Sequence, residues 1–151
     1  MDIKRKLATI RTIKYVEPIP NADSIVKLTF ESMGWVCVTD KATNPRPGDK
    51  RIYFEVDSVL PKIPIFDFMK DHNYRVKTIK LRGQVSQGLS IPLSEIVEAF
   101  NLPAEVYSHI HAPDYPLDIL EDGTDLTDVL GVVKYEAPVT TQIGGDTKGA
   151  F

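Results

Sequence analysis

The chain has 151 residues, a size that suits one domain, and its apolar and charged fractions of 42% and 26% are those of an ordinary globular protein. No apolar run is long enough to cross a membrane. The single cysteine, Cys37, excludes an internal disulfide and favours an intracellular, reducing compartment such as the cytoplasm or nucleus.

The net charge of −3 hides an asymmetry along the chain. Residues 1–82 carry 16 Lys and Arg against 10 Asp and Glu, whereas residues 83–151 carry 2 against 11. This split indicates a basic face on the first half that suits a polyanion. The chain is not basic enough for charge alone to predict nucleic-acid binding.

The first part of the chain reads as short strands separated by turns. Turn clusters of Pro, Asn, Asp and Gly occupy residues 18–23 and 44–49. Residues 59–74 mix prolines with aromatics and predict an irregular connection with one helical turn. Alternating or β-branched runs predict strands at 7–16, 24–30, 34–40, 51–57, 75–81 and 88–92.

About five short strands without alternating long helices favour a mainly β fold, an OB-fold-like antiparallel β-barrel closed or nearly closed over residues 7–92. Its core is predicted to contain Ile10, Ile25, Leu28, Val36, Val38, Ile52, Phe54, Val56, Ile79 and Leu89.

Beside this barrel, residues 93–137 are expected to form an appendage of short helices and loop. Ser94 is a predicted N-cap for a helix ending at Phe100, and Thr124 for a helix at 123–132. Residues 138–151 lack periodicity and predict an irregular tail. The domain is therefore expected to span residues 1–137.

No catalytic or metal-binding constellation is apparent, and neither glycine-rich phosphate-binding motif is present. Cys37 and Trp35 are interpreted as packed residues rather than a nucleophile and a stacking platform. His109 and His111 are assigned to a surface loop rather than a metal site. The charged residues near the fourth strand are interpreted as an ordinary solvated strand edge: Asp49, Glu55 and Asp57 beside Lys50 and Arg51.

The stretch "TIKLRGQVSQGLSIP" (78–92) carries the candidate nucleic-acid site. Basic and amide side chains converge there, and two glycines, Gly83 and Gly88, permit close approach of a ligand or a neighbouring strand. The alternative is a bulged hairpin whose glycines serve only curvature, with Arg82 bracing the barrel through Asp57. The predicted binding residues are Lys77, Lys80, Arg82, Gln84 and Gln87, with Lys41 and Arg46 from a neighbouring loop.

Four blocks in this order, residues 18–40, 47–61, 75–96 and 123–138, resemble the N-terminal OB domain of a nick-sealing, ATP-dependent RNA ligase family. In that family an OB domain precedes a nucleotidyltransferase domain. The resemblance implies a role in joining a 3′-hydroxyl to a 5′-phosphate in RNA-containing duplex, with such nicked RNA and the nucleotidyltransferase domain as partners.

The family's nucleotide-bearing lysine motif has no good match in this chain. "KYEA" (134–137) is nearest, but Ala137 stands where the motif has Gly. The chain alone is therefore expected to have no ligase activity, and residues 138–151 are expected to be a linker toward a catalytic domain that the chain lacks. ATP and a divalent metal are implied for that domain, and no cofactor or metal for this one.

Two other functions remain open. "PNADSI" and "KLRGQVSQGL" are also similar to the tRNA-binding OB module of some aminoacyl-tRNA synthetases, although only two short blocks are shared. A protein-docking or dimerisation domain is the alternative from a different class, because the second half is acidic and the helix at 94–100 offers an apolar face.

Overall fold

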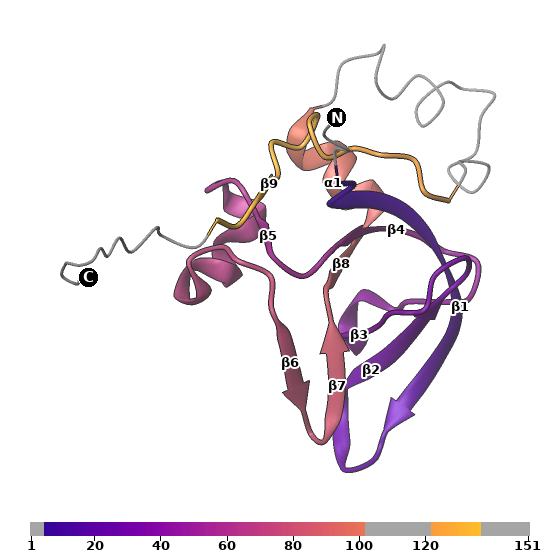
Figure 1. Ribbon diagram of the computed structural model, residues 1–151. Helices are drawn as coiled ribbons and strands as arrows, with labels where there is room; N and C mark the ends of the chain where they lie inside the picture. Colours follow the sequence, from indigo (N-terminus) through magenta and orange to yellow (C-terminus); the bar gives the residue numbers. More distant parts are fainter. Residues whose placement is uncertain (1–4, 102–121, 137–151) are drawn as a thin grey trace, which may run out of the picture.

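The computed structural model describes residues 5–101 and 122–136, which form a mainly β structure with one α-helix (Figure 1). No helix within these ranges is long and apolar enough to span a membrane. The elements in chain order are β1 (Ala8–Ile19), β2 (Ala22–Phe30), β3 (Val36–Asp40), η1 (Lys41–Thr43), β4 (Lys50–Phe54), β5 (Ser58–Val59), η2 (Pro64–His72), β6 (Thr78–Leu81), β7 (Gln84–Gln87), β8 (Leu89–Pro92), α1 (Leu93–Phe100) and β9 (Val133–Lys134).

Five strands form one curled antiparallel sheet in the order β3–β2–β1–β4–β8. The long strand β1 is shared, since its first part pairs with β4, beginning with Ala8 opposite Phe54, and its second part pairs with β2. The partner changes between Thr12 and Ile13, and a register shift between Ile13 and Tyr15 follows at once; such an irregularity bends a strand. The sheet curls into a half-barrel, which confirms the predicted OB-like antiparallel fold.

Side chains connect the two edge strands of this half-barrel. Arg51 on β4 donates from Nη2 to Thr39 Oγ1 on β3 at 3.0 Å, and from Nε to Ser90 Oγ on β8 at 2.9 Å. The Val38 N–H on β3 donates to Ser86 Oγ on β7 at 2.9 Å. We call this line of contacts the seam: Thr39, Arg51, Ser86 and Ser90. The two edges of the half-barrel are connected along the seam by these side-chain hydrogen bonds.

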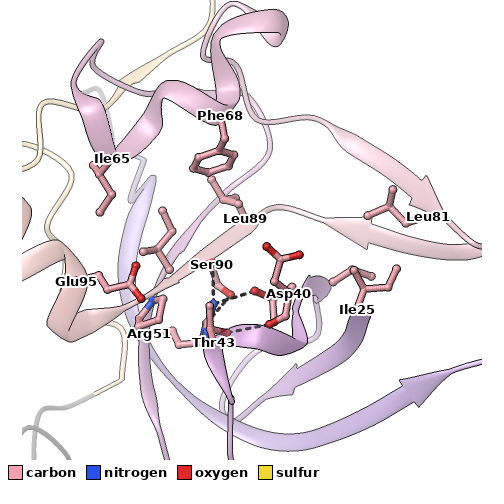
Figure 2. A pocket seen from close by; sticks show the side chains of 14 residues that line it. Ile25, Asp40, Thr43, Arg51, Ile65, Phe68, Leu81, Leu89, Ser90 and Glu95 are labelled. Carbon is pink, nitrogen blue, oxygen red and sulfur yellow. Dashed lines mark hydrogen bonds between the residues drawn. The ribbon is translucent and has the colours of Figure 1, made fainter. Parts of the chain in front are cut away.

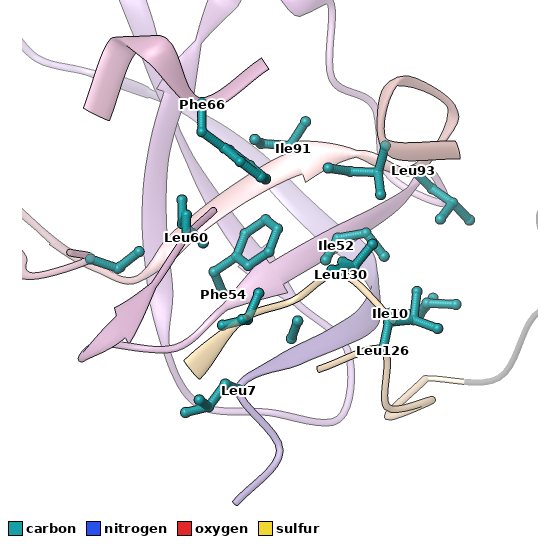
Figure 3. Close-up of a cluster of buried hydrophobic side chains, with 14 of the residues drawn as sticks. Leu7, Ile10, Ile52, Phe54, Leu60, Phe66, Ile91, Leu93, Leu126 and Leu130 are labelled. Carbon is teal, nitrogen blue, oxygen red and sulfur yellow. The ribbon is translucent and has the colours of Figure 1, made fainter. Parts of the chain in front are cut away.

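Two hydrophobic clusters fill the interior. The larger one lies where β1, β4 and β8 face η2, α1 and the segment 122–136, and Figure 3 shows Phe54, Phe66 and Leu130 pointing into it. The rings of Phe54 and Phe66 meet edge to face, with centroids 5.6 Å apart. The smaller cluster lies under β2 and β3 and contains Ile13, Val26, Leu28, Phe30, Cys37 and Tyr53.

The predicted core is partly confirmed. Four of its residues are buried: Ile10, Leu28, Ile52 and Phe54. Five are half-buried: Ile25, Val36, Val38, Val56 and Leu89. The prediction for Ile79 is wrong, since 43% of this residue is exposed.

Ile79 is exposed because residues 78–87 do not form a barrel strand. They form a separate two-stranded hairpin, β6–β7, which projects from the barrel, and only β8 of the predicted strand pair enters the main sheet (Figure 1). Ile79 and Leu81 alternate with polar residues whether the segment is a barrel strand or a strand of a separate hairpin. The periodicity of the sequence therefore does not distinguish these two arrangements.

The base of the hairpin is held tightly against β4. Gly88 has φ +101°, and a Cβ there would lie 2.6 Å from Tyr53 Cε1, well inside contact distance. The Tyr53 hydroxyl donates to the Gln87 carbonyl oxygen. Gly88 therefore serves the close approach of a neighbouring strand, one of the two roles that the sequence predicts for it.

Helix α1 follows β8 directly. Ile96 and Val97 are buried and Phe100 packs at the edge of the larger cluster, so the apolar face of the helix is turned toward the core. The N-cap prediction is wrong, because the helix begins at Leu93 after Pro92, which places Ser94 inside its first turn.

The predicted helix at 123–132 is absent, and the segment forms turns along β1 instead. Its backbone bonds to β1, with Leu126 N–H donating to the Ala8 carbonyl at 2.8 Å and Ile10 N–H donating to the Thr124 carbonyl at 3.1 Å. The Thr127 hydroxyl accepts the N–H groups of Leu7 and Ala8. Because the Leu126 N–H and the Thr124 carbonyl bond to β1, the segment closes irregular turns instead of a helix. Leu130 N–H donates to the Leu126 carbonyl, Gly131 N–H to the Asp128 carbonyl and Val132 N–H to the Thr127 carbonyl.

The Gly88→Ala variant is expected to lower the free energy of unfolding by about 2–5 kcal/mol, because Ala adds both left-handed backbone strain and a clash with Tyr53. Gly83→Ala is the matched control, since φ there is +84° but nothing lies within 4 Å of the added Cβ. It should cost about 1–2 kcal/mol. Denaturant unfolding measures both, and equal losses would contradict the close packing at Gly88.

The Thr127→Val variant is expected to lower the free energy of unfolding by about 2–4 kcal/mol, because it leaves two buried N–H groups without an acceptor. The control is Thr43→Val, whose exposed hydroxyl bonds only to the Asp40 carbonyl, and it should change stability by less than about 0.5 kcal/mol. Thermal and denaturant unfolding measure the stability of both variants. If Thr127→Val is as stable as Thr43→Val, residues 122–136 are not an integral part of the domain.

Candidate nucleic-acid interface

The β6–β7 hairpin closes with a two-residue turn at Arg82 and Gly83. Both central residues have positive φ, 52° and 84°, as in the type I′ turns that match the twist of a hairpin. Asn, Asp and Gly favour this conformation, whereas an arginine in it carries strain of about 1–2 kcal/mol. Seven other non-glycine residues in the described ranges also have positive φ, so the charge and exposure of Arg82, rather than its backbone conformation, make it a candidate for phosphate binding.

Five of the seven predicted binding residues lie on this hairpin or just before it. Lys77, Lys80 and Arg82 are exposed, and no hydrogen bond or ion pair holds them among residues 5–101 and 122–136. The Gln84 side-chain amide donates one hydrogen bond to the neighbouring Val85 carbonyl, at 2.8 Å. Gln87 is fixed through its backbone carbonyl, which leaves its side-chain amide without a bonded partner in the described ranges.

The other two predicted residues lie across the seam, in the connection from β3 to β4. Lys41 is exposed in η1, directly after β3. Arg46 is exposed in the following turn, where its backbone N–H donates to the Asp49 carboxylate at 3.0 Å. No hydrogen bond or ion pair within the described ranges joins either residue to the hairpin.

Asp57 does not brace Arg82. Its carboxylate accepts from the guanidinium of Arg75 at 2.8 Å, and that guanidinium also lies over the Tyr135 ring, 3.6 Å from the centroid. The alternative in which Arg82 braces the barrel by pairing with Asp57 is therefore wrong.

A cavity of about 420 Å³ lies between the hairpin, η2, β3 and β8 (Figure 2). Its walls are mainly apolar and include Phe68, which is 58% exposed, and Leu81 from the hairpin. Asp40 and Glu95 add carboxylates to its lining, and Arg51 contributes a buried cation. An apolar hollow with a few polar groups is the usual form of a binding pocket.

Arg51 was misassigned as part of a solvated strand edge, for it is only 2% exposed. It lies on β4, where every residue from Arg51 to Phe54 is buried, so both faces of the strand are covered. Burial lowers the pKa of Arg51 from its usual value, and Cys37, Glu95 and Asp49 oppose this shift. The continuous apolar run "IYF" after Arg51 was the available signal, since it is typical of a strand covered on both faces.

Trp35 was also misassigned, because half of it (50%) is exposed. It lines a second cavity of about 250 Å³ with Arg5, Tyr53, Glu55, Thr78 and Gln87. Gly34 before it and the short turn between β2 and β3 were the only sequence signals of a loop position.

The described residues contain no group of three or more His, Cys, Asp or Glu that suits a metal ion. His109 and His111 lie outside them. Cys37 is buried, as predicted, and burial raises the pKa of its thiol to about 11, against a smaller opposing effect of its contact with Ser90. The arrangement can bind an anionic polymer or an apolar group.

A family model for an OB-fold domain matches residues 7–93, more than half of the chain. No curated protein sequence matches. Among solved structures, a Naegleria gruberi RNA ligase mutant with ATP and Mn is 32% identical with a TM-score of 0.68, over 94% of this chain and 39% of that chain. The Naegleria gruberi RNA ligase with PPi is 31% identical with a TM-score of 0.64, over 98% and 40%.

A further mutant of that ligase, with AMP and Mn, is 31% identical with a TM-score of 0.64, over 94% of this chain and 39% of that chain. The chain thus spans about two-fifths of the length of the ligase chains it resembles. It belongs to the OB-fold domain family, and the resemblance to the OB domain of an RNA ligase is confirmed.

Cys37 is expected to resist thiol reagents such as DTNB in the native protein at pH 8, because burial and a raised pKa keep it a protonated, inaccessible thiol. In denaturant, where its pKa returns toward the ordinary range, one thiol per chain should react rapidly. Rapid labelling of the native protein at pH 8 would contradict this account and reopen Cys37 as a reactive group.

Proposed function

We propose that this OB-fold domain is the accessory domain of an RNA ligase and helps to engage 3′-hydroxyl/5′-phosphate nicks in RNA-containing duplex for sealing. The likeness to the Naegleria gruberi RNA ligase, which covers 94% of this chain at 32% identity, carries the proposal. A nucleotidyltransferase domain elsewhere in such a ligase is its partner. That domain uses ATP and a divalent metal, and this chain supplies binding rather than a reacting group.

The position of the basic hairpin supports this proposal. OB-folds bind oligonucleotides on the face of their second and third strands and on the loops that connect strands one to two and four to five. Here β4 and β8 are the fourth and fifth barrel strands, so the β6–β7 hairpin lies in the second of these connections. Its tip and the β1–β2 turn point to the same end of the barrel (Figure 1).

The charge of this connection also supports RNA as its ligand. Residues 72–94 contain no Asp or Glu but four Lys or Arg: Arg75, Lys77, Lys80 and Arg82. Three of them are exposed and lack an ion-pair partner within the described residues. Exposed cations in such a cluster neutralise phosphates of the nucleic acid and release its counterions. Arg82 can in addition hold one phosphate with two parallel hydrogen bonds.

An intracellular compartment is part of the proposal. The only cysteine is a buried free thiol, which is compatible with a reducing environment.

The apolar cavity favours a second candidate, docking of the nucleotidyltransferase domain. Phe68 and Leu81 leave apolar surface exposed at its mouth, with Ile79 close by on the same hairpin. Adjoining exposed apolar residues are typical of protein contacts rather than phosphate contacts. In this alternative the hairpin cations contact the partner domain and not RNA.

The Arg82→Asn variant tests the proposal, because Asn suits the left-handed turn while removing the charge. Its melting temperature should equal or exceed that of the wild type. Its affinity for nicked RNA duplex should fall about five- to tenfold, and the slope of log affinity against log salt should become shallower by about one. Fluorescence anisotropy with labelled duplex at several salt concentrations measures both quantities.

Lys134→Gln is the matched control, because it removes one exposed positive charge on β9, far from the hairpin in the chain. It should leave affinity almost unchanged. If both variants lose the same affinity for nicked RNA duplex, the loss reflects the net charge of the domain and not a contact made by Arg82. Unchanged RNA binding by Arg82→Asn, combined with impaired sealing when the variant is placed in a ligase, would favour docking instead.

A further inference from the structure

The second cavity, beside Trp35, lies outside the phosphate-binding role argued above. It is bounded by the turn between β2 and β3, by β4 and by the base of the β6–β7 hairpin. Its volume of about 250 Å³ suits one planar group of the size of a nucleobase rather than a larger ligand. Trp35 forms one wall and is half-exposed.

The charges in this cavity cancel. Arg5 and Glu55 are paired at 3.0 Å, and Arg5 also donates to the Val56 carbonyl at 2.9 Å. The Tyr53 hydroxyl is occupied by the Gln87 carbonyl, and burial raises the pKa of Tyr53, so it stays neutral. The cavity thus favours a neutral group over a phosphate.

Two polar side chains in the lining lack a bonded partner within the described residues. They are the Thr78 hydroxyl and the Gln87 amide, which belong to directly opposite residues of the hairpin and therefore share one face. A hydroxyl and an amide supply both donors and acceptors, which can pair with the edge of a base while its ring stacks on an indole.

Lys80 connects this cavity to the basic hairpin. It lies two residues beyond Thr78 on β6, so it is on the same face of the hairpin and nearer the tip. Lys80 and Arg82 are therefore placed to contact the phosphate of a nucleotide whose base lies in this cavity.

We propose that this cavity holds one unpaired nucleobase of the RNA, stacked on Trp35 and contacted by Thr78 and Gln87. The inference rests on the proposed RNA-binding function and narrows its substrate class. A fully paired nick has no free base to offer, so the site selects breaks with an unpaired nucleotide or a single-stranded extension beside them. A base that is already unpaired enters without the cost of leaving a duplex stack.

The test uses Trp35 as its own reporter, because it is the only tryptophan of the chain. Titration with a six-nucleotide single-stranded RNA should quench its fluorescence, and a blunt, fully paired nicked duplex should quench it much less. An oligomer of the same length with abasic positions should bind about tenfold more weakly than the intact oligomer, because stacking is lost.

The Trp35→Leu variant should bind the intact oligomer about tenfold more weakly and should no longer distinguish it from the abasic oligomer. Its affinity for blunt nicked duplex should change less than twofold. Phe68→Leu is the matched control, since it removes an exposed aromatic ring at the other cavity, and it should preserve the distinction between the two oligomers.

Two results would overturn the inference while leaving the proposed function intact. The first is salt-dependent RNA binding, seen with labelled RNA, without any change in Trp35 fluorescence at saturation. The second is a Trp35→Leu variant that distinguishes intact from abasic oligomers as well as the wild type does. Absence of binding to both single-stranded RNA and nicked duplex would overturn the proposed function itself.

Discussion

A single buried guanidinium, that of Arg51, connects the two edge strands of the half-barrel, and one of these strands leads directly from the basic hairpin. Arg51 extends from β4 and bonds to Thr39 on one edge strand and to Ser90, through both hydroxyl and carbonyl, on the other. Burial of a charge is unfavourable unless hydrogen bonds and opposite charges compensate it. Those bonds hold β3 and β8 in place, and because β7 runs directly into β8, they also fix the origin of the basic hairpin.

The barrel was predictable from the sequence because its determinants are local. Turn residues such as Pro20 and Asn21 separate the β-branched runs that form β1 and β2. The helix predicted at 123–132 failed for the opposite reason. Its Thr, Asp and Leu residues satisfy a helix pattern, but the bonds from Leu126 and Thr127 to β1 depend on residues more than a hundred positions away.

The same distinction applies to the candidate site. The exposed cations of the hairpin were recognisable from composition, because a run of Lys and Arg without acidic neighbours is exposed in almost any fold. The exposure of Trp35 and the burial of Arg51 were not, since each depends on which strands lie alongside. Arg51 is covered because its guanidinium is enclosed between β3 and β8, whereas Trp35 lies in the turn between β2 and β3 beside an open cavity.

The hairpin combines a rigid base with an exposed tip, and this combination fits binding better than support of the barrel. Gly88 and Tyr53 fix the base by close packing and one hydrogen bond. Toward the tip, Ile79, Leu81 and Val85 remain exposed, and Arg82 adopts a left-handed conformation that a glycine or asparagine would adopt with less strain. None of these features of the tip stabilises the isolated domain. Because the base of the hairpin holds the tip in one orientation, less entropy is lost when a ligand binds at the tip. The rigid base and the exposed cations of the tip therefore both favour contact with an extended polyanion.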